Sequence, residues 1–331
     1  MIYYTATDQN RREENQDSSL CADIRVNHEA AVSVYCVADG MGGLLGGKMY
    51  SKDAIREFYQ RLMFLLTGDE FVEGSLEEQL TLLETFSSQV YKKINRVLYQ
   101  RGMDLGYQGG TTLSVAIHFW DTWFLSNCGD SPIYVRKDKK LRLASQIQNE
   151  AGRLIREGKT NLGSPLYYMN KNRLLQYLGQ REEVMPAVSV CKDDKVDQLL
   201  LGTDGAFGDC SLGDLETILD HGRMDRGALR RIFEKSKDRR EEDNQTAILI
   251  VNHDRRERKN HAPEKKVSEE KKVSEGKKVS EEKEVLEKRD SENQIDKESQ
   301  VETIAYRKVE RESRLEKFGE LWNRRRRKKD E

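Results

Sequence analysis

The sequence predicts an α+β fold in which antiparallel strands and amphipathic helices lie in layers. Short apolar runs of strand-like composition recur through roughly the first 250 residues, and several neighbouring runs are joined by very short links. A parallel crossover needs a dozen or more residues, so these links indicate hairpins. Two long segments also carry apolar stripes of helical period. Together these features favour a layered sandwich over a doubly wound parallel sheet.

The expected strands contain most of the apolar runs in this part of the chain. Their clearest link is Trp120-Asp121, which separates two apolar runs by only two residues. Because this link is so short, the flanking runs should pair antiparallel. The predicted strands cover residues 32–38, 111–119, 122–126, 133–135, 141–144, 187–191, 198–201 and 246–251.

Two long helices are expected after the first of these strands. One apolar stripe runs from Ala54 to Leu66, and the other runs from Leu76 to Val97. Ser75 followed by Glu78 has the spacing of a capping box and marks the start of the second helix. Shorter helical patterns occur at residues 215–219 and 229–233.

Composition divides the chain of 331 residues into a folded domain, 1–254, and a charged tail, 255–331. The tail repeats KKVSEE-like hexapeptides between Lys265 and Glu282, and one valine per repeat cannot build a core. Its end, residues 315–329, combines a few apolar residues with a basic cluster. That end is expected either to contact an anionic membrane or an acidic partner, or to act only as a solubilising terminus.

Charge and cysteine content exclude several classes of protein. The net charge is −1, so no global basic field argues for nucleic-acid binding. The five cysteines are odd in number and form no C-x-x-C pair, which favours a reducing compartment. Neither an 18-residue apolar run nor a signal-peptide pattern is present, so a cytoplasmic location is expected.

Carboxylates stand at the ends of three apolar runs. Asp39 and Asp204 each follow such a run and precede a glycine, and Asp243 stands just before another run. Because buried strands converge at a common edge of a sheet, these carboxylates can meet in space, and a cluster of like charges normally requires a cation. A divalent metal site is therefore the first hypothesis for function.

The ordered set of motifs resembles a known family. The segments, in chain order, are Arg12-Glu13-Glu14-Asn15-Gln16-Asp17, Asp39-Gly40-Met41-Gly42-Gly43, Gly110-Thr111-Thr112, Gly129-Asp130-Ser131, Thr203-Asp204-Gly205 and Asp243-Asn244-Gln245-Thr246. Over residues 5–252 this order is similar to that of the metal-dependent protein Ser/Thr phosphatases of the PPM group, or protein phosphatase type 2C, in its compact bacterial form. The resemblance implies an α-β-β-α sandwich of two antiparallel sheets flanked by helix pairs, with a binuclear Mg²⁺ or Mn²⁺ centre.

The resemblance also implies metal ligands. Asp39 would bridge the two metals, and the Gly40 carbonyl would bind one of them. Asp204 and Asp243 would bind the other metal. Asp130 would hold a weaker third metal together with Asp204. Carboxylates, carbonyls and waters are the hard oxygen ligands that Mg²⁺ and Mn²⁺ prefer.

The remaining implied roles concern the substrate. Arg12 would hold the substrate phosphate, and Asp17 would anchor metal-bound water. A metal-activated water would then hydrolyse phosphoserine and phosphothreonine in phosphoproteins without a phosphoenzyme, opposing a cognate Ser/Thr kinase. None of the five histidines falls in a matched motif, so a catalytic histidine is not expected.

Several positions depart from the family pattern. Lys48 stands where a glutamate is usual, Pro132 replaces a common arginine, and residues 145–150 replace an Asp-His-Ser segment. A glycine usual between Asp8 and Arg12 is missing. Residues 152–179 would form a variable flap, whose basic side chains either attract phosphopeptides or are ordinary solvated surface.

Two alternatives to a phosphatase remain at this stage. A pseudophosphatase would keep the fold as a binding or scaffold module, and Lys48 is its best support. A haloacid-dehalogenase type of phosphohydrolase would need an Asp-x-Asp pair after the first strand, and no such pair is present there.

Overall fold

A computed structural model describes residues 1–28, 30–107, 109–181, 183–208, 210–221, 226–239 and 241–252, with residues 43–45 described as backbone only. The chain divides into two units, Met1–Pro263 and Glu264–Glu331, and every described residue lies in the first. The predicted tail, with its repeats and basic end, lies outside the described residues. Within the described part of the chain, no helix is long and apolar enough to cross a membrane.

Two five-stranded antiparallel sheets form the centre of the first unit, as predicted. One sheet has the order β1-β12-β11-β8-β9 and the other has the order β10-β7-β6-β3-β2. The first contains β1 (Ile2–Asp8), β12 (Gln245–Val251), β11 (Gln198–Gly202), β8 (Ile133–Lys137) and β9 (Lys140–Leu143). The second contains β10 (Ala187–Lys192), β7 (Thr122–Cys128), β6 (Leu113–Phe119), β3 (Ala31–Ala38) and β2 (Ser18–Arg25). A short pair, β4 (Gly40–Met41) and β5 (Gly110–Thr111), lies beyond β3.

Alternating side chains divide the apolar residues into three layers. In β3, Val34 and Cys36 belong to the cluster beneath the helices, whereas Tyr35 and Val37 belong to the cluster between the sheets. β12 alternates in the same way, with Leu249 beneath helices and Ile248 and Ile250 between the sheets. This period of two on strands buried on both faces explains why they form nearly continuous apolar runs.

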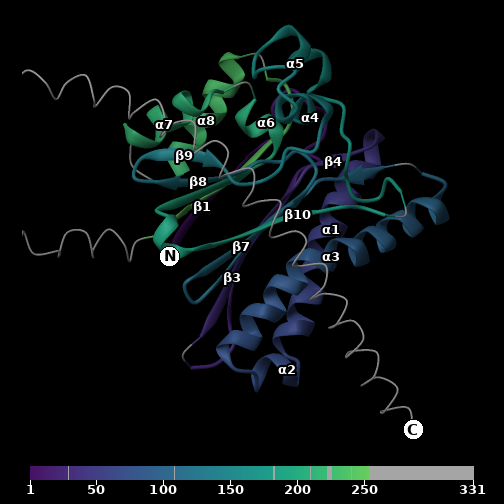
Figure 1. The fold of residues 1–331 in the computed structure, drawn as a ribbon. Helices are drawn as coiled ribbons and strands as arrows, with labels where there is room; N and C mark the ends of the chain where they lie inside the picture. The colour runs from purple at the N-terminus through teal and green to yellow at the C-terminus, as the bar shows by residue number, and fades with distance from the viewer. Residues whose placement is uncertain are drawn as a thin grey trace, which may run out of the picture. The chain divides into compact units, whose positions relative to one another are not determined.

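Helices cover both outer faces of the sandwich (Figure 1). The long helices α1 (Gly43–Leu66) and α3 (Leu76–Leu105) pack side by side on the β3 sheet, joined through α2 (Asp69–Val72). The predicted capping box at Ser75 and Glu78 starts α3. On the other sheet lie α6 (Asp204–Phe207), α7 (Leu212–Asp220) and α8 (Arg226–Asp238).

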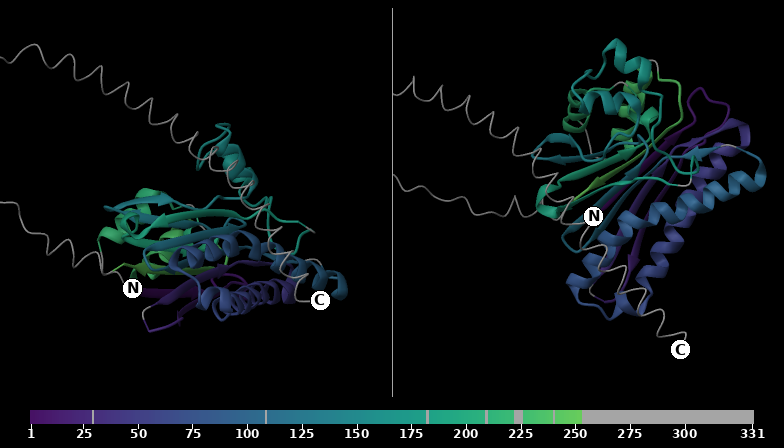
Figure 2. Two further views of the ribbon diagram at one scale, coloured as in Figure 1. Left: turned by 60° about the horizontal axis from the view of Figure 1, so that its bottom comes forward. Right: turned by 45° about the vertical axis from the view of Figure 1, so that its right-hand side comes forward.

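Between β9 and β10 the chain forms α4 (Glu150–Arg156) and α5 (Pro165–Asn170), which contact each other and stand beside the strands (Figure 2). These helices fill the segment expected as a flap. A short 3₁₀ turn, Asp193–Lys195, links β10 to β11.

The larger strands differ from the sequence prediction at β1, at β2 and within residues 111–119. Neither β1 nor β2 was predicted, because their residues are mostly half-exposed and include serine, threonine and aspartate. The expected strand 111–119 is broken at Thr112. The Thr112 hydroxyl accepts the Asp39 amide at 2.9 Å and bonds to the Ser131 hydroxyl at 2.7 Å, so this residue ties loops together.

Candidate metal centre

The predicted acidic residues meet at one end of the sandwich, where strands of both sheets end. Asp17 and Asp39 adjoin β2 and β3, whereas Asp204 and Asp243 adjoin β11 and β12 of the other sheet. The carboxyl of Asp39 interacts electrostatically with those of Asp17, Asp204 and Asp243. Asp130, in the turn between β7 and β8, interacts with Asp204. The sequence-based expectation of a carboxylate cluster is thus met in space.

Asp39 lies at the middle of this cluster. Burial, together with the nearby charges of Asp17 and Asp204, raises the pKa of Asp39 well above its usual range. The Asp39 and Asp204 side chains are hydrogen-bonded to each other, which requires a shared proton. Asp204 is exposed at the mouth of the cluster and begins α6, where its Oδ1 accepts the Gly205 amide at 2.8 Å.

Asp17 is one of the two buried acidic residues of the cluster, the other being Asp130. Its side chain is 5% exposed, and its Oδ2 accepts the Thr203 hydroxyl at 3.0 Å. Its Oδ1 is buried without a hydrogen-bond partner. Burial is the main reason that the pKa of Asp17 is raised to about 7, with Asp204 and Asp243 adding to the effect. An orphaned carboxylate oxygen of this kind fits a site built for a cation or its water.

Asp130 connects the cluster to α4. Its Oδ2 accepts the Asn149 side-chain amide at 3.0 Å, and the same amide donates to the Lys171 carbonyl at 2.7 Å. Asn149 also caps α4, where its Oδ1 accepts the Gly152 amide at 2.8 Å. Burial raises the pKa of Asp130 to about 7. The Asn149 amide was not predicted as part of the site, and only its helix-capping position signals it.

Two glycines beside the cluster are required by close backbone approach. A Cβ on Gly40 would lie 2.1 Å from the Gly47 carbonyl oxygen, and one on Gly205 would lie 2.2 Å from the Asn244 carbonyl oxygen. No side chain fits at either position without movement of the backbone. The Asp-Gly pairs therefore bring loops together in addition to forming turns.

Arg12 lies in the loop between β1 and β2, hereafter the N-terminal loop. Its guanidinium donates to Asp243 Oδ2 at 2.7 Å and is 58% exposed. Asn244 fixes the loop, because its side chain donates to the Gln9 carbonyl at 2.8 Å and accepts the Gln16 amide at 2.9 Å. The structure thus places Arg12 at the carboxylate cluster despite the missing glycine.

Lys48 does not enter the cluster. Its ammonium group donates to the backbone carbonyl of Asn15 in the N-terminal loop. The Lys48 ammonium group, which motivated the pseudophosphatase alternative, therefore contacts a loop carbonyl. It does not offset the negative charge of the carboxylates.

In the expected flap, two basic side chains form ion pairs and several apolar side chains are exposed. Arg153 pairs with Glu150 and Glu157, and Lys159 also pairs with Glu157. Leu162 and Met169 are 60% and 76% exposed. Among the histidines, His118 lies against Trp123 and bonds to Asp193 at 3.0 Å, which is a packing role.

The carboxylates are gathered but do not form a ready metal cage. Within the described ranges, no group of three or more His, Cys, Asp or Glu side chains is arranged to hold an ion. Three of the carboxylates are engaged within the protein, since Asp39 contacts Asp204 and Arg12 contacts Asp243. The donor set, the orphaned Asp17 oxygen and the crowding of like charges nevertheless fit Mg²⁺ or Mn²⁺.

Comparisons with known proteins find similar bacterial phosphatases. The serine/threonine phosphatase stp of Listeria monocytogenes is 28% identical over 251 residues, covering 74% of this chain and 93% of that protein. Protein phosphatase PhpP of Streptococcus pneumoniae is 26% identical over 214 residues, covering 63% and 80%. No protein-family model matches the chain.

Solved structures show the same fold. The serine/threonine phosphatase Stp1 from Staphylococcus aureus superposes with a TM-score of 0.62 at 21% identity, covering 76% of this chain and 94% of that one. The serine threonine protein phosphatase PstP, solved in complex with 2 manganese ions, superposes with a TM-score of 0.58 at 21% identity, covering 76% and 97%. These likenesses confirm the α-β-β-α architecture predicted from the sequence.

Proposed function

We propose that the chain is a PPM-type protein serine/threonine phosphatase, which hydrolyses phosphoserine and phosphothreonine in phosphoproteins with the help of Mg²⁺ or Mn²⁺. The observation that carries the proposal is the convergence of Asp17, Asp39, Asp130, Asp204 and Asp243 from both sheets on one cluster. Burial, and after it the charge of neighbouring carboxylates, raises the pKa of Asp17, Asp39, Asp130 and Asp204, and divalent cations offset such repulsion.

The proposed ligand assignment follows the motif order. Asp39 and the Gly40 carbonyl would hold one metal, Asp39 would be shared with a second, and Asp204 and Asp243 would hold that second metal. Asp130 would hold a weaker third metal together with Asp204. When bound, the metals supply Lewis-acid polarisation of the phosphate and a nucleophile derived from water at neutral pH.

The chain's own residues then bind and orient the substrate. Arg12 holds the phosphate oxygens with its exposed guanidinium, for which the phosphate competes with Asp243. Asp17, held by Thr203, offers its Oδ1 as a hydrogen-bond acceptor to water in the site. Neither role requires a covalent phosphoenzyme.

The cysteines support a mechanism without a thiolate nucleophile. Burial raises the pKa of Cys21 and Cys128 to about 12 and that of Cys191 to about 11. Burial also raises the pKa of Cys36 well above its usual value. These thiols stay protonated near pH 7, whereas a cysteine-dependent phosphatase needs a lowered thiol pKa.

Partners and location follow from the activity. The substrates are proteins phosphorylated by a Ser/Thr kinase, and the cytoplasm is the compartment that fits the cysteine pattern. Nothing in the site favours the pseudophosphatase alternative, since Lys48 is engaged with Asn15.

The test compares hydrolysis of a phosphothreonine peptide with and without Mn²⁺, for the wild type and for Asp204→Asn. We expect activity that depends on Mn²⁺ and is lost in the variant. Asp194→Asn, an exposed position on the 3₁₀ turn, is the matched control and should retain activity. Activity that is absent, or indifferent to both metal and the Asp204 variant, refutes the proposal.

A further inference from the structure

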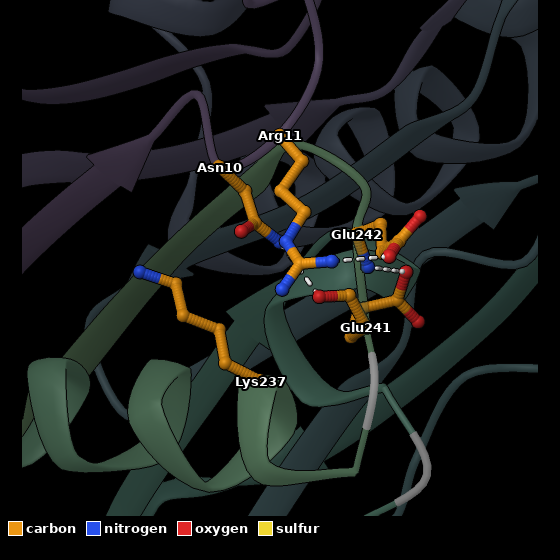
Figure 3. A pocket seen from close by; sticks show the side chains of 5 residues that line it. All are labelled: Asn10, Arg11, Lys237, Glu241 and Glu242. Carbon is orange, nitrogen blue, oxygen red and sulfur yellow. Dashed lines mark hydrogen bonds and ion pairs between the residues drawn. The ribbon is translucent and has the colours of Figure 1, made fainter.

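The turn that carries Asp243 lies beside a pocket of about 360 Å³, lined by Asn10, Arg11, Lys237, Glu241 and Glu242 (Figure 3). Its two basic and two acidic side chains leave no net charge that would select a ligand. The exposed pair between Arg11 and Glu242, at 2.7 Å, contributes little. One lining residue, Glu241, instead bonds directly to the backbone of the turn.

The Glu241 side chain holds this turn through two backbone amides. Its Oε1 accepts the amide of Glu242 at 3.0 Å and the amide of Asp243 at 3.0 Å. One side-chain oxygen that accepts both amides fixes the direction of two successive peptide groups. The position of the Asp243 backbone therefore depends on the side chain two residues earlier.

The backbone of Glu241 is fixed as well. Its carbonyl accepts the Asn10 side-chain amide at 2.9 Å, and that amide also donates to the Asp243 carbonyl at 3.0 Å. Its own amide donates to the Ser236 carbonyl at 3.2 Å at the end of α8. A Cβ placed on Gly208 would lie 3.2 Å from the Glu241 Cβ, so the end of α6 also packs against it.

We propose that Glu241 is a positioning residue for metal binding: its carboxylate and Asn10 fix the turn that presents Asp243 and hold it against the N-terminal loop that carries Arg12. The inference rests on the proposed function for the identity of the ion that Asp243 binds. Groups that hold a metal ligand in place without touching the metal strongly affect metal affinity. Removing one typically weakens metal binding by about 10- to 100-fold.

Two variants at position 241 separate the effect of the hydrogen-bond acceptor from the effect of the negative charge. Glu241→Gln keeps an oxygen that can accept both amides, whereas Glu241→Ala removes it. Glu242→Ala is the matched control, because its side chain pairs only with exposed Arg11 in the interactions described. Asn10→Gly tests the same turn from the other side, since Asn10 has φ 52° and glycine tolerates that conformation.

The experiment measures Mn²⁺ binding to the full chain by titration calorimetry, together with the melting temperature in EDTA. We expect Glu241→Ala to bind Mn²⁺ about 10-fold or more weakly, Asn10→Gly to be weakened in the same direction, and Glu241→Gln and Glu242→Ala to bind within about threefold of wild type. If Glu241→Ala does not fold, Asn10→Gly decides the question.

Two results overturn the inference while leaving the phosphatase proposal intact. One is a folded Glu241→Ala, or Asn10→Gly in its place, that binds Mn²⁺ as tightly as wild type. The other is a Glu241→Gln variant as weak as Glu241→Ala, which would assign the effect to charge. A wild-type chain that neither binds Mn²⁺ nor hydrolyses phosphopeptides refutes the function itself and with it the metal role of Asp243.

Discussion

Replacing Asp17 by asparagine should stabilise the metal-free protein at alkaline pH. Asparagine keeps the shape of the side chain and an oxygen that can accept the Thr203 hydroxyl. Its amide nitrogen takes the place of the oxygen that lacks a partner and faces other carboxylates. The substitution therefore removes a buried negative charge from a like-charged cluster.

The magnitude follows from the raised pKa of Asp17, about 7 against a usual value of 3.8. Because this pKa is raised, the stability that protonated Asp17 contributes is complete below about pH 4 and is lost as pH rises through about 7. At about 1.4 kcal/mol per pH unit the loss is about 2 kcal/mol at pH 5.5 and about 4 kcal/mol at pH 8.5. Asparagine does not titrate, so Asp17→Asn should be more stable than wild type by these amounts.

Thermal unfolding in EDTA at pH 5.5 and pH 8.5 is the assay. A gain of about 4 kcal/mol corresponds to a rise of about 8 to 16 °C in melting temperature for a domain of this size. Asp194→Asn controls for the loss of a surface carboxylate. With saturating Mn²⁺ the wild type should become as stable as the variant, since the ion offsets the negative charge of Asp17. The reasoning is refuted if Asp17→Asn is no more stable than wild type at pH 8.5, or gains equally at both pH values.

Three further predictions concern the site and the scaffold. Asp243→Asn should lower kcat/KM for a phosphopeptide by at least about 100-fold, since even an outer partner of a ligand can be worth that much; an active variant in a Mn²⁺ titration would contradict the ligand role. Gly205→Ala should lower the free energy of unfolding by about 1 to 3 kcal/mol, because its Cβ would lie 2.2 Å from the Asn244 carbonyl oxygen. Chemical denaturation measures the change, and an unchanged midpoint would show that the loops do not approach so closely. Ser75→Ala should remove the capping box of α3 and cost about 1 kcal/mol; kcat should stay the same, and a parallel loss of activity would point to coupling between α3 and the site.

The sequence predicted the central strands well because they are buried on both faces. β3, β11 and β12 are nearly continuous apolar runs, so their ends, and the aspartates at those ends, were visible from composition. β1 and β2 were missed because their side chains are mostly half-exposed and mixed in character. The capping box at Ser75 was predictable because it is a local interaction.

The proximity of the acidic residues was predictable from the sequence, but the contacts that support them were not. Motif order identified Asp39, Asp204 and Asp243, since each directly adjoins a strong strand signal. The link from Asn149 to Asp130 and the bonds from Glu241 depend on tertiary packing, and no residue spacing encodes them. The contact of Lys48 with the Asn15 carbonyl could not be predicted either, because a lysine in place of a glutamate does not show where its ammonium group points.

The division of the acidic residues between the two sheets has a consequence for control of the protein. Asp39 is attached to β3 and Asp243 to β12, and the side chains of Leu201 and Ile248 belong to the layer between those sheets. The separation of the acidic residues is therefore set by how the sheets are stacked. A small molecule that wedges into that layer, or a core substitution that slides one sheet over the other, would act as a remote inhibitor without touching any residue at the mouth of the site.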